Sequence, residues 1–294
     1  MPILTVETWE GRDVSVAAID GELARLREQI AGDGEQPHQR TSVMTHVAWV
    51  PPEWREAAER TLEGMEERHP SRTVILVPEP DAPAGTHARL SVRCFNVAGR
   101  TICGEVVELS LCGPRAAAPA SLVLPLAISD LPVFLRWRGA PPFGAEPWEQ
   151  LVHVADRVIV DSSEWDALRY PELAEVFETT AISDLAWARL HGWRLELASR
   201  WPEIREQEIR IRGPEAEAGL LRGWLASRLG RTVRPLEPAD ELGVRLGGEE
   251  LRPPPGPEPT PSDLLSDQLD VFSRDRVYEE AVLAAASAAA RPGA

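Results

Sequence analysis

The sequence predicts an α/β fold: a mixed, mostly parallel sheet covered by helices, a second smaller α/β domain and a C-terminal helix. Three observations predict it. Wholly apolar strand-like runs alternate with amphipathic helical patterns, two long alternating runs follow one another like a hairpin, and a fresh set of short elements begins after Trp201-Pro202. We expect a main domain over 1–200, a small domain over 201–251, a proline-rich linker over 252–261, and a C-terminal helix and tail over 262–294.

The first elements indicate parallel strands. An amphipathic helix is expected over 15–31, followed by a polar break at 32–34. The strand 43–50, the helix opened by Pro51-Pro52 and the strand 73–77 form a βαβ unit, which favours a parallel pair.

The next two strands, 87–97 and 101–112, are expected to pair antiparallel. If the turn is Ala98-Gly99, Cys94 lies opposite Cys103 on a non-hydrogen-bonded pair. If the turn is Gly99-Arg100, Cys94 faces Glu105 and Cys103 faces Asn96. The pattern leaves both registers open.

The remaining elements complete the two sheets. In the main domain they are a helix over 119–126, strands over 132–137 and 157–160, and helices over about 164–178 and 183–200. In the small domain they are a strand over 204–211, a helix over 214–229, and short strands over 232–236 and 244–246. A last helix is expected from Ser262 to about Val282, ahead of an alanine-rich tail.

Composition excludes several functions. The formal charge of −16, from 47 acidic and 31 basic residues, argues against a nucleic-acid backbone or an anionic membrane as the principal partner. The sequence contains no lysine, which excludes Schiff-base and phosphate-loop lysine chemistry. The common dinucleotide, hydrolase and zinc motifs are absent as well. We therefore predict no cofactor and no metal, and we expect a cytoplasmic protein without a membrane span.

The segment 183–194 is the most unusual part of the chain, because two tryptophans, two arginines, an aspartate and a histidine fall within about three helical turns. Read as a helix capped by Ser183, it buries Ala186, Leu190, Trp193 and Leu197. A flank then carries four other side chains: Asp184, Trp187, His191 and Arg194. This flank is either a binding surface or ordinary packing and charge pairing.

The run Asp184-Leu185-Ala186-Trp187, followed by Arg189-Leu190 and Trp193-Arg194, resembles the OpcA family of glucose-6-phosphate dehydrogenase assembly proteins. Further similar stretches follow in the family's order: His69-Pro70-Ser71-Arg72, Asp130-Leu131-Pro132-Val133, Ala155 to Ser162, and Asp263 through Tyr278. The resemblance implies a non-catalytic protein that binds glucose-6-phosphate dehydrogenase and supports its active oligomer in the oxidative pentose phosphate pathway, and hence NADPH supply. It leaves this protein's own oligomeric state open.

Three hypotheses follow, each with its own residues. A partner or ligand patch would comprise Asp184, Trp187, Arg189, His191 and Arg194, together with Trp137 and Arg138. Alternatively, an enzyme or sensor would hold a small sugar-phosphate-like anion at Arg157, Asp161 and Ser162, with Arg194, although Asp161 or Ser162 also suits a helix cap. Third, the resemblance raises thiol regulation, for which Cys94 and Cys103 are the candidates.

Overall fold

The computed structural model describes residues 3–31, 42–62, 65–97, 100–234, 237–252, 256–257 and 259–289. The chain divides into two compact units. The first comprises 1–159 and 265–271, and the second comprises 160–264 and 272–294. The domain limits expected from the sequence stay a prediction.

The predicted fold class is confirmed. An eight-stranded mixed sheet has the order β1-β4-β5-β3-β2-β6-β7-β8, and a four-stranded sheet has the order β10-β9-β11-β12. The strands of the larger sheet are β1 (Ile3–Gly11), β2 (Met44–Trp49), β3 (Ser71–Glu79), β4 (Gly85–Val97), β5 (Arg100–Cys112), β6 (Val133–Trp137), β7 (Arg157–Val160) and β8 (Ala181–Asp184). Strands β2, β3, β5, β6 and β7 pair parallel, whereas β1, β4 and β5 pair antiparallel.

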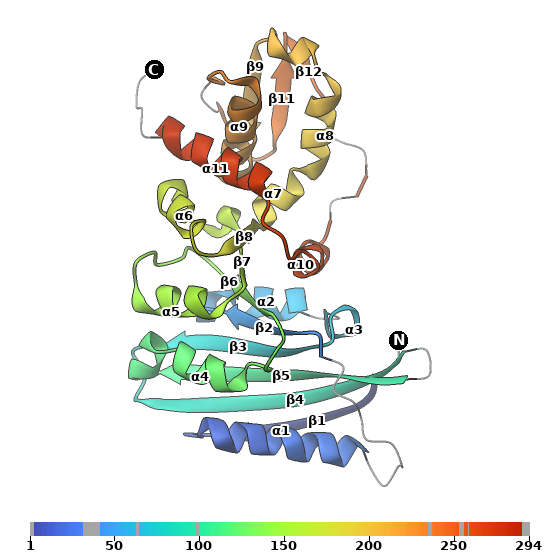
Figure 1. The fold of residues 1–294 in the computed structure, drawn as a ribbon, viewed down its shortest axis with the longest axis vertical. Helices are drawn as coiled ribbons and strands as arrows, with labels where there is room; N and C mark the ends of the chain where they lie inside the picture. Colours follow the sequence, from blue (N-terminus) through green and yellow to red (C-terminus); the bar gives the residue numbers. More distant parts are fainter. Residues whose placement is uncertain are drawn as a thin grey trace. The chain divides into compact units, whose positions relative to one another are not determined.

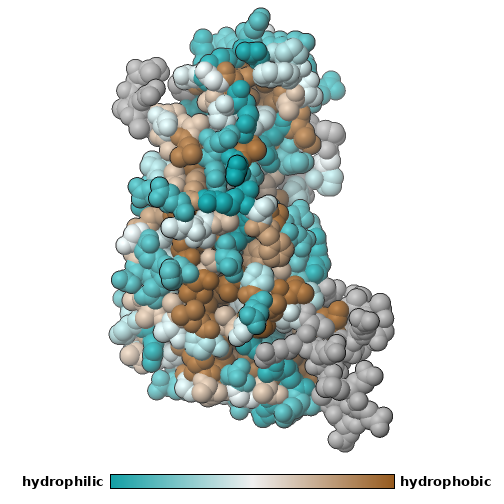
Figure 2. Space-filling view, viewed as in Figure 1, coloured by the Kyte–Doolittle hydropathy of each residue, from teal (hydrophilic) through white to brown (hydrophobic). Residues whose placement is uncertain are grey.

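Helices cover the sheet of the first unit on two sides (Figure 1). One side carries α1 (Val16–Ala31), α4 (Ala120–Leu126) and α5 (Glu146–Val154), and the other carries η1 (Pro52–Trp54), α2 (Arg55–Leu62) and α3 (Met65–Arg68). Alternate residues of β4 and β5, such as Leu90 and Leu109, are fully buried, as are Ile19 and Leu23 of α1. Because strand side chains alternate, the intervening residues of β4 and β5 face the side of α2. Figure 2 shows hydrophobic residues grouped over α4 and α5, where Leu124 is 60% exposed.

A buried ion pair holds the first unit together beside its apolar core. Arg72 of β3 donates to Glu105 of β5 at 2.7 Å and to the carbonyl of Leu126 at 2.9 Å. Glu105 also pairs with Arg27 of α1 at 3.1 Å. Both members of the central pair are about 95% buried or more. Removing Glu105 would therefore leave the buried guanidinium of Arg72 without its close carboxylate, whereas removing Arg72 would leave Glu105 paired with Arg27.

The second unit contains the smaller sheet and most of the remaining helices. Its strands are β9 (Ile209–Gly213), β10 (Glu237–Pro238), β11 (Gly243–Leu246) and β12 (Glu249–Glu250). Its helices are η3 (Ser162–Glu164), α6 (Tyr170–Val176), α7 (Leu185–Arg189), α8 (His191–Ser199), η4 (Glu203–Arg205), α9 (Glu215–Leu229) and α11 (Arg276–Ala289). Helix α10 (Pro261–Leu269) crosses the division between the two units.

Several predicted elements differ in detail from the structure. The helix expected over 183–200 is two helices, α7 and α8. Its cap is Asp184 rather than Ser183, because α7 begins at Leu185 and the Asp184 carboxylate accepts from the backbone N–H of Ala186. The helix expected from Ser262 is likewise split into α10 and α11. The helix expected over 164–178 shortens to α6 because Pro171 fixes its first turn, and η4 replaces the start of the strand expected over 204–211.

Strand β1 was not predicted, because Thr5 to Trp9 lies outside the segments with a clear period. Residues 232–234 lie outside any strand, and the rest of the strand expected over 232–236 lies outside the described residues. The polar break at 32–34, the turn at 98–99, part of the linker and the tail beyond 289 also lie outside them.

Candidate functional site

Asp184 lies at the centre of a buried polar cluster in the second unit. It ends β8, and its Oδ1 accepts hydrogen bonds from the backbone N–H of Ala186 at 2.9 Å and of Ser162 at 3.1 Å. Its Oδ2 accepts a hydrogen bond from the Tyr278 hydroxyl on α11 at 3.2 Å. The carboxylate thus caps α7 and joins three separate parts of the unit.

The environment of Asp184 changes its acidity. Burial, and next the negative charge of Asp161, raise its pKa from 3.8 to about 6, although the hydrogen bonds from Ser162 and Ala186 oppose the shift. Burial and the charge of Asp184 raise the pKa of Tyr278 well above 10. Tyr278 therefore remains a hydroxyl donor at neutral pH.

Arg189, the last residue of α7, forms an ionic cluster next to Asp184. It donates to both carboxylate oxygens of Asp161, at 2.6 and 3.1 Å, and to Glu217 of α9 at 3.0 Å. It also donates to the Ser163 hydroxyl at 2.6 Å. Burial disfavours its charge, but the hydrogen bonds and charges of Asp161 and Glu217 outweigh this effect and raise the pKa of Arg189. The planar guanidinium therefore fastens η3 and α9 to α7.

Trp187 connects α7 to the C-terminal helix. Its indole N–H donates to Asp275 at 2.8 Å, and Asp275 also accepts from the backbone N–H of Val277 and Tyr278 at the start of α11. The guanidinium of Arg194 lies 3.7 Å from the centroid of the Trp187 ring. Burial lowers the pKa of Arg194, and the negative charge of Asp275 offsets only part of this shift. The contact with the ring is a cation–π interaction that favours the charged form.

The residues of the predicted contact patch are therefore distributed between surface and interior. Asp184 and Trp187 are 1% and 4% exposed, the Arg189 side chain is 31% exposed, and His191 is on the surface. The other two members, Trp137 and Arg138, belong to the first unit. Whether these residues contact a partner stays a prediction.

Trp137 and Arg138 pack within the first unit. Trp137 stacks on Trp49 with ring centroids 4.8 Å apart, and the ring of Trp148 lies edge-on to it. Arg138 is 7% exposed and lies over the Trp54 ring at 5.0 Å. Gly139 follows with φ +73°, and a Cβ there would lie 2.9 Å from the Trp54 indole nitrogen, so this tight turn requires glycine.

The residues of the predicted anion cleft have partners of their own. Arg157 is buried in the first unit, whereas Asp161 and Ser162 belong to the second. Asp161 caps η3 by accepting from the backbone N–H of Ser163, which is the capping role expected for it. The anion cleft stays a prediction.

The hairpin register is the one given by a turn at Ala98-Gly99. Cys94 pairs with Cys103, and Val97 pairs with Arg100. The two sulfurs form a disulfide, with the Cα atoms 4.1 Å apart. Cys112 is a free, buried cysteine. A regulatory role for the disulfide stays a prediction.

Sequence reasoning missed two partners of the cluster, Glu217 and Asp275. The signal that could have found Asp275 is its position just ahead of Val277-Tyr278, a stretch already noted for its resemblance to the family. Among the residues that the structure describes, no group of three or more His, Cys, Asp or Glu side chains could hold a metal ion. No helix in the same residues is both long and apolar enough to cross a bilayer.

Comparison with known proteins supports the sequence resemblance. The family domain described as glucose-6-phosphate dehydrogenase subunit N-terminal domain matches residues 63–175, and the corresponding C-terminal domain matches residues 180–252. The chain is 30% identical over 181 residues to the OxPP cycle protein OpcA of Nostoc punctiforme and 30% identical over 179 residues to that of Synechocystis sp.. These matches cover 55% of this chain but only 38% and 37% of the relatives, so the chain spans less than half the length of the curated relatives it matches.

Proposed function

Because the chain belongs to the OpcA family, we propose that it is a non-catalytic assembly factor that binds glucose-6-phosphate dehydrogenase and allosterically activates it. In this role it supports the active oligomer of that enzyme, and through it NADPH supply from the oxidative pentose phosphate pathway. We place this activity in the cytoplasm.

The observation that carries the proposal is that Arg189 and Asp184 are bound by partners within the second unit. Arg189 is held by Asp161 and Glu217, and Asp184 is held by Tyr278 and two backbone amides. Groups with these partners stabilise a rigid body, whereas a catalytic acid or base needs access to a substrate proton. A rigid body that presents a surface is what an assembly factor requires.

Activation by binding requires a difference in affinity. A protein that bound the active and inactive oligomers equally well would shift nothing, however tightly it bound. We therefore propose that this chain contacts surfaces brought together only in the active oligomer. A coupling free energy of about 1–3 kcal/mol would change the ratio of active to inactive oligomer by roughly 5- to 150-fold.

The test is a titration of purified glucose-6-phosphate dehydrogenase from the same organism with this protein. Enzyme activity and sedimentation are measured on the same samples, under reducing and under oxidising conditions. Saturable activation together with a co-sedimenting complex is the expected result. No binding and no activation in either condition would refute the proposal, and would move the sugar-phosphate alternative at Arg157, Asp161 and Ser162 to first place.

A further inference from the structure

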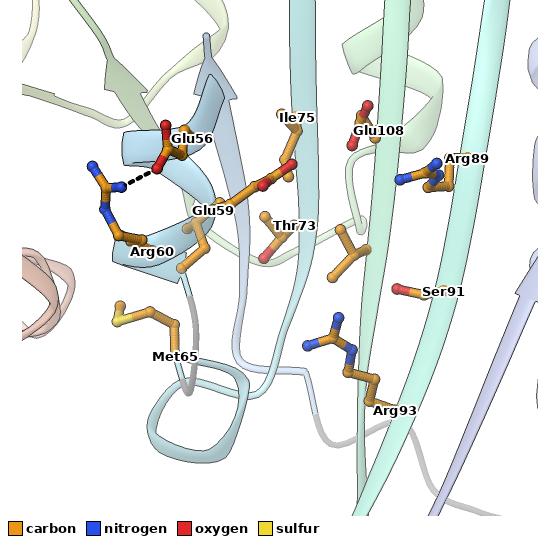
Figure 3. A pocket seen from close by; sticks show the side chains of 12 residues that line it. Glu56, Glu59, Arg60, Met65, Thr73, Ile75, Arg89, Ser91, Arg93 and Glu108 are labelled. Carbon is orange, nitrogen blue, oxygen red and sulfur yellow. Dashed lines mark hydrogen bonds and ion pairs between the residues drawn. The ribbon is translucent and has the colours of Figure 1, made fainter. Parts of the chain in front are cut away.

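A cavity of about 470 Å³ opens on the side of the sheet that faces α2, entirely within the first unit. Its base is formed by Thr73 and Ile75 of β3 and Val106 of β5. Leu62 and Met65, from α2 and α3, close one edge. Figure 3 shows the α2 side chains on one side of Thr73 and Ile75 and the β4 side chains on the other. The cavity is thus apolar at its base and charged along both walls.

A second cavity, of about 620 Å³, continues from the first toward β1. The two share Arg89 and Glu108, and the second is also lined by Gly11, His87 and Ser110. Together they form one trough across β3, β5 and β4, and their combined volume exceeds the roughly 300–1,000 Å³ range of small-molecule pockets. An elongated, open trough of this size fits a segment of a protein better than a small ligand.

The trough differs in charge from the rest of the chain. Its walls carry five arginines and four glutamates, whereas the whole chain carries 31 basic and 47 acidic residues. On β4, Arg89, Ser91 and Arg93 face the trough at alternate positions (Figure 3). Two residues four apart on a strand are separated by about 13 Å. The β4 wall therefore presents two cations with a small hydroxyl between them.

Two of the ion pairs at the walls are exposed and can be exchanged at little cost. Arg89 pairs with Glu10 at 2.8 Å, and these side chains are 60% and 68% exposed. Arg60 pairs with Glu56 at 2.5 Å, and these are 66% and 84% exposed. Exposed pairs of this kind contribute about 0–1 kcal/mol. An incoming carboxylate could replace Glu10 on Arg89. The new ion pair would be screened less by water than the exposed pair, because the docked partner covers it.

We propose that this trough is the docking surface for glucose-6-phosphate dehydrogenase, an inference that rests on the function proposed above. The occupant is an amphipathic helix of the enzyme. Its apolar stripe packs on Ile75 and Val106, and two carboxylates about two helical turns apart reach Arg89 and Arg93. A second copy of this chain is a poorer occupant, because two chains that each carry a net charge of −16 repel one another.

The first test is charge reversal with a matched control. The double variant Arg89→Glu/Arg93→Glu should weaken dehydrogenase binding by at least about 30-fold. The control is Arg25→Glu/Arg115→Glu, which makes the same change in net charge at exposed arginines outside the trough and should stay within about threefold of wild type. Affinity is measured by titration of the labelled full chain with the dehydrogenase, and the fold of each variant is checked by circular dichroism.

The second test locates the contact without changing any charge. A photoreactive amino acid is placed at Ser91 inside the trough or, as a control, at Ser121 on α4, on the other side of the sheet. The expected result is a cross-link to the dehydrogenase from position 91 and none from position 121. If wild type binds but the double reversal binds equally well and position 91 gives no cross-link, the trough is the wrong surface and the proposed function stands. A cross-link from position 91 to a second copy of this chain would also overturn the inference, and wild type that fails to bind would refute both proposals.

Discussion

Replacing Asp184 with asparagine should change how the stability of this protein depends on pH. In the folded protein its pKa is raised from 3.8 to about 6, so between these values the folded state holds a proton that the unfolded chain has released. A state that binds more protons is stabilised at low pH. The contribution of Asp184 is therefore favourable below about pH 4 and is lost as pH rises through about 6.

The size of this effect follows from the shift. About two pKa units at 1.36 kcal/mol each give about 3 kcal/mol between the protonated and ionised limits. Roughly half of this falls between about pH 5 and pH 7.5. Asparagine cannot ionise there, but its Oδ1 can still accept from the backbone N–H of Ser162 and Ala186. Relative to wild type, the variant should gain about 1.4 kcal/mol of stability across that interval.

The assay is urea unfolding of wild type and Asp184→Asn at several pH values, followed by tryptophan fluorescence. The control is Asp166→Asn, which removes one exposed carboxylate from the same unit. The difference in the free energy of unfolding between Asp184→Asn and wild type should change with pH by about 1.4 kcal/mol, and the control shows how much of any change comes from the loss of one negative charge. A flat difference for Asp184→Asn, within about 0.5 kcal/mol, would show that burial does not perturb this carboxyl and would refute the reasoning.

Three further predictions concern packing and cross-links. Arg189→Met should lower the free energy of unfolding by about 2 kcal/mol, because it leaves the charged carboxylate of Asp161 without the partly buried guanidinium that binds both of its oxygens. Denaturant titration at neutral pH measures this loss. Gly223→Ala should lower the free energy of unfolding by about 2 kcal/mol or more, because its Cβ would lie 2.2 Å from a carbonyl oxygen of α11. Gly21→Ala on α1 is the matched control: its Cβ meets nothing within 4 Å, so it should raise the free energy of unfolding by up to about 1 kcal/mol. Full reduction should add two hydrogens to the intact mass, and Cys94→Ser should abolish that difference and cost about 2–3 kcal/mol in oxidised protein.

Local patterns were sufficient to predict most of the main sheet. The strands β2 to β7 follow from apolar runs and from strict alternation, because both patterns reflect which faces of a strand are buried. Strand β1 escaped prediction because hydrophobicity does not follow burial there: apolar Val6 is 44% exposed, whereas polar Glu7 on the opposite face is partly buried. The antiparallel pairing of β1 with β4 is a long-range contact that no local pattern records.

The start of α7 escaped prediction for a different reason. The apolar stripe of Ala186, Leu190, Trp193 and Leu197 runs through α7 and α8, and all four residues are buried as expected. A helical period fixes which residues face inward, but it says little about where a helix begins. The start is decided by Asp184, whose carboxylate also binds Ser162 and Tyr278, and those partners lie 22 and 94 residues away in sequence.

These side chains have partners that are far away in sequence, and this is why residue types alone suggested a binding surface on α7 and α8. Trp, Arg and Asp are the residues that interfaces favour, but they are also the residues that form buried polar clusters once their charges are paired. What distinguishes the two cases is whether the partner belongs to the same chain. For Arg189 it does, through Asp161 and Glu217. For Arg89 the partner is an exposed glutamate that water already competes for, so a carboxylate of a second protein can replace it in the trough beside α2.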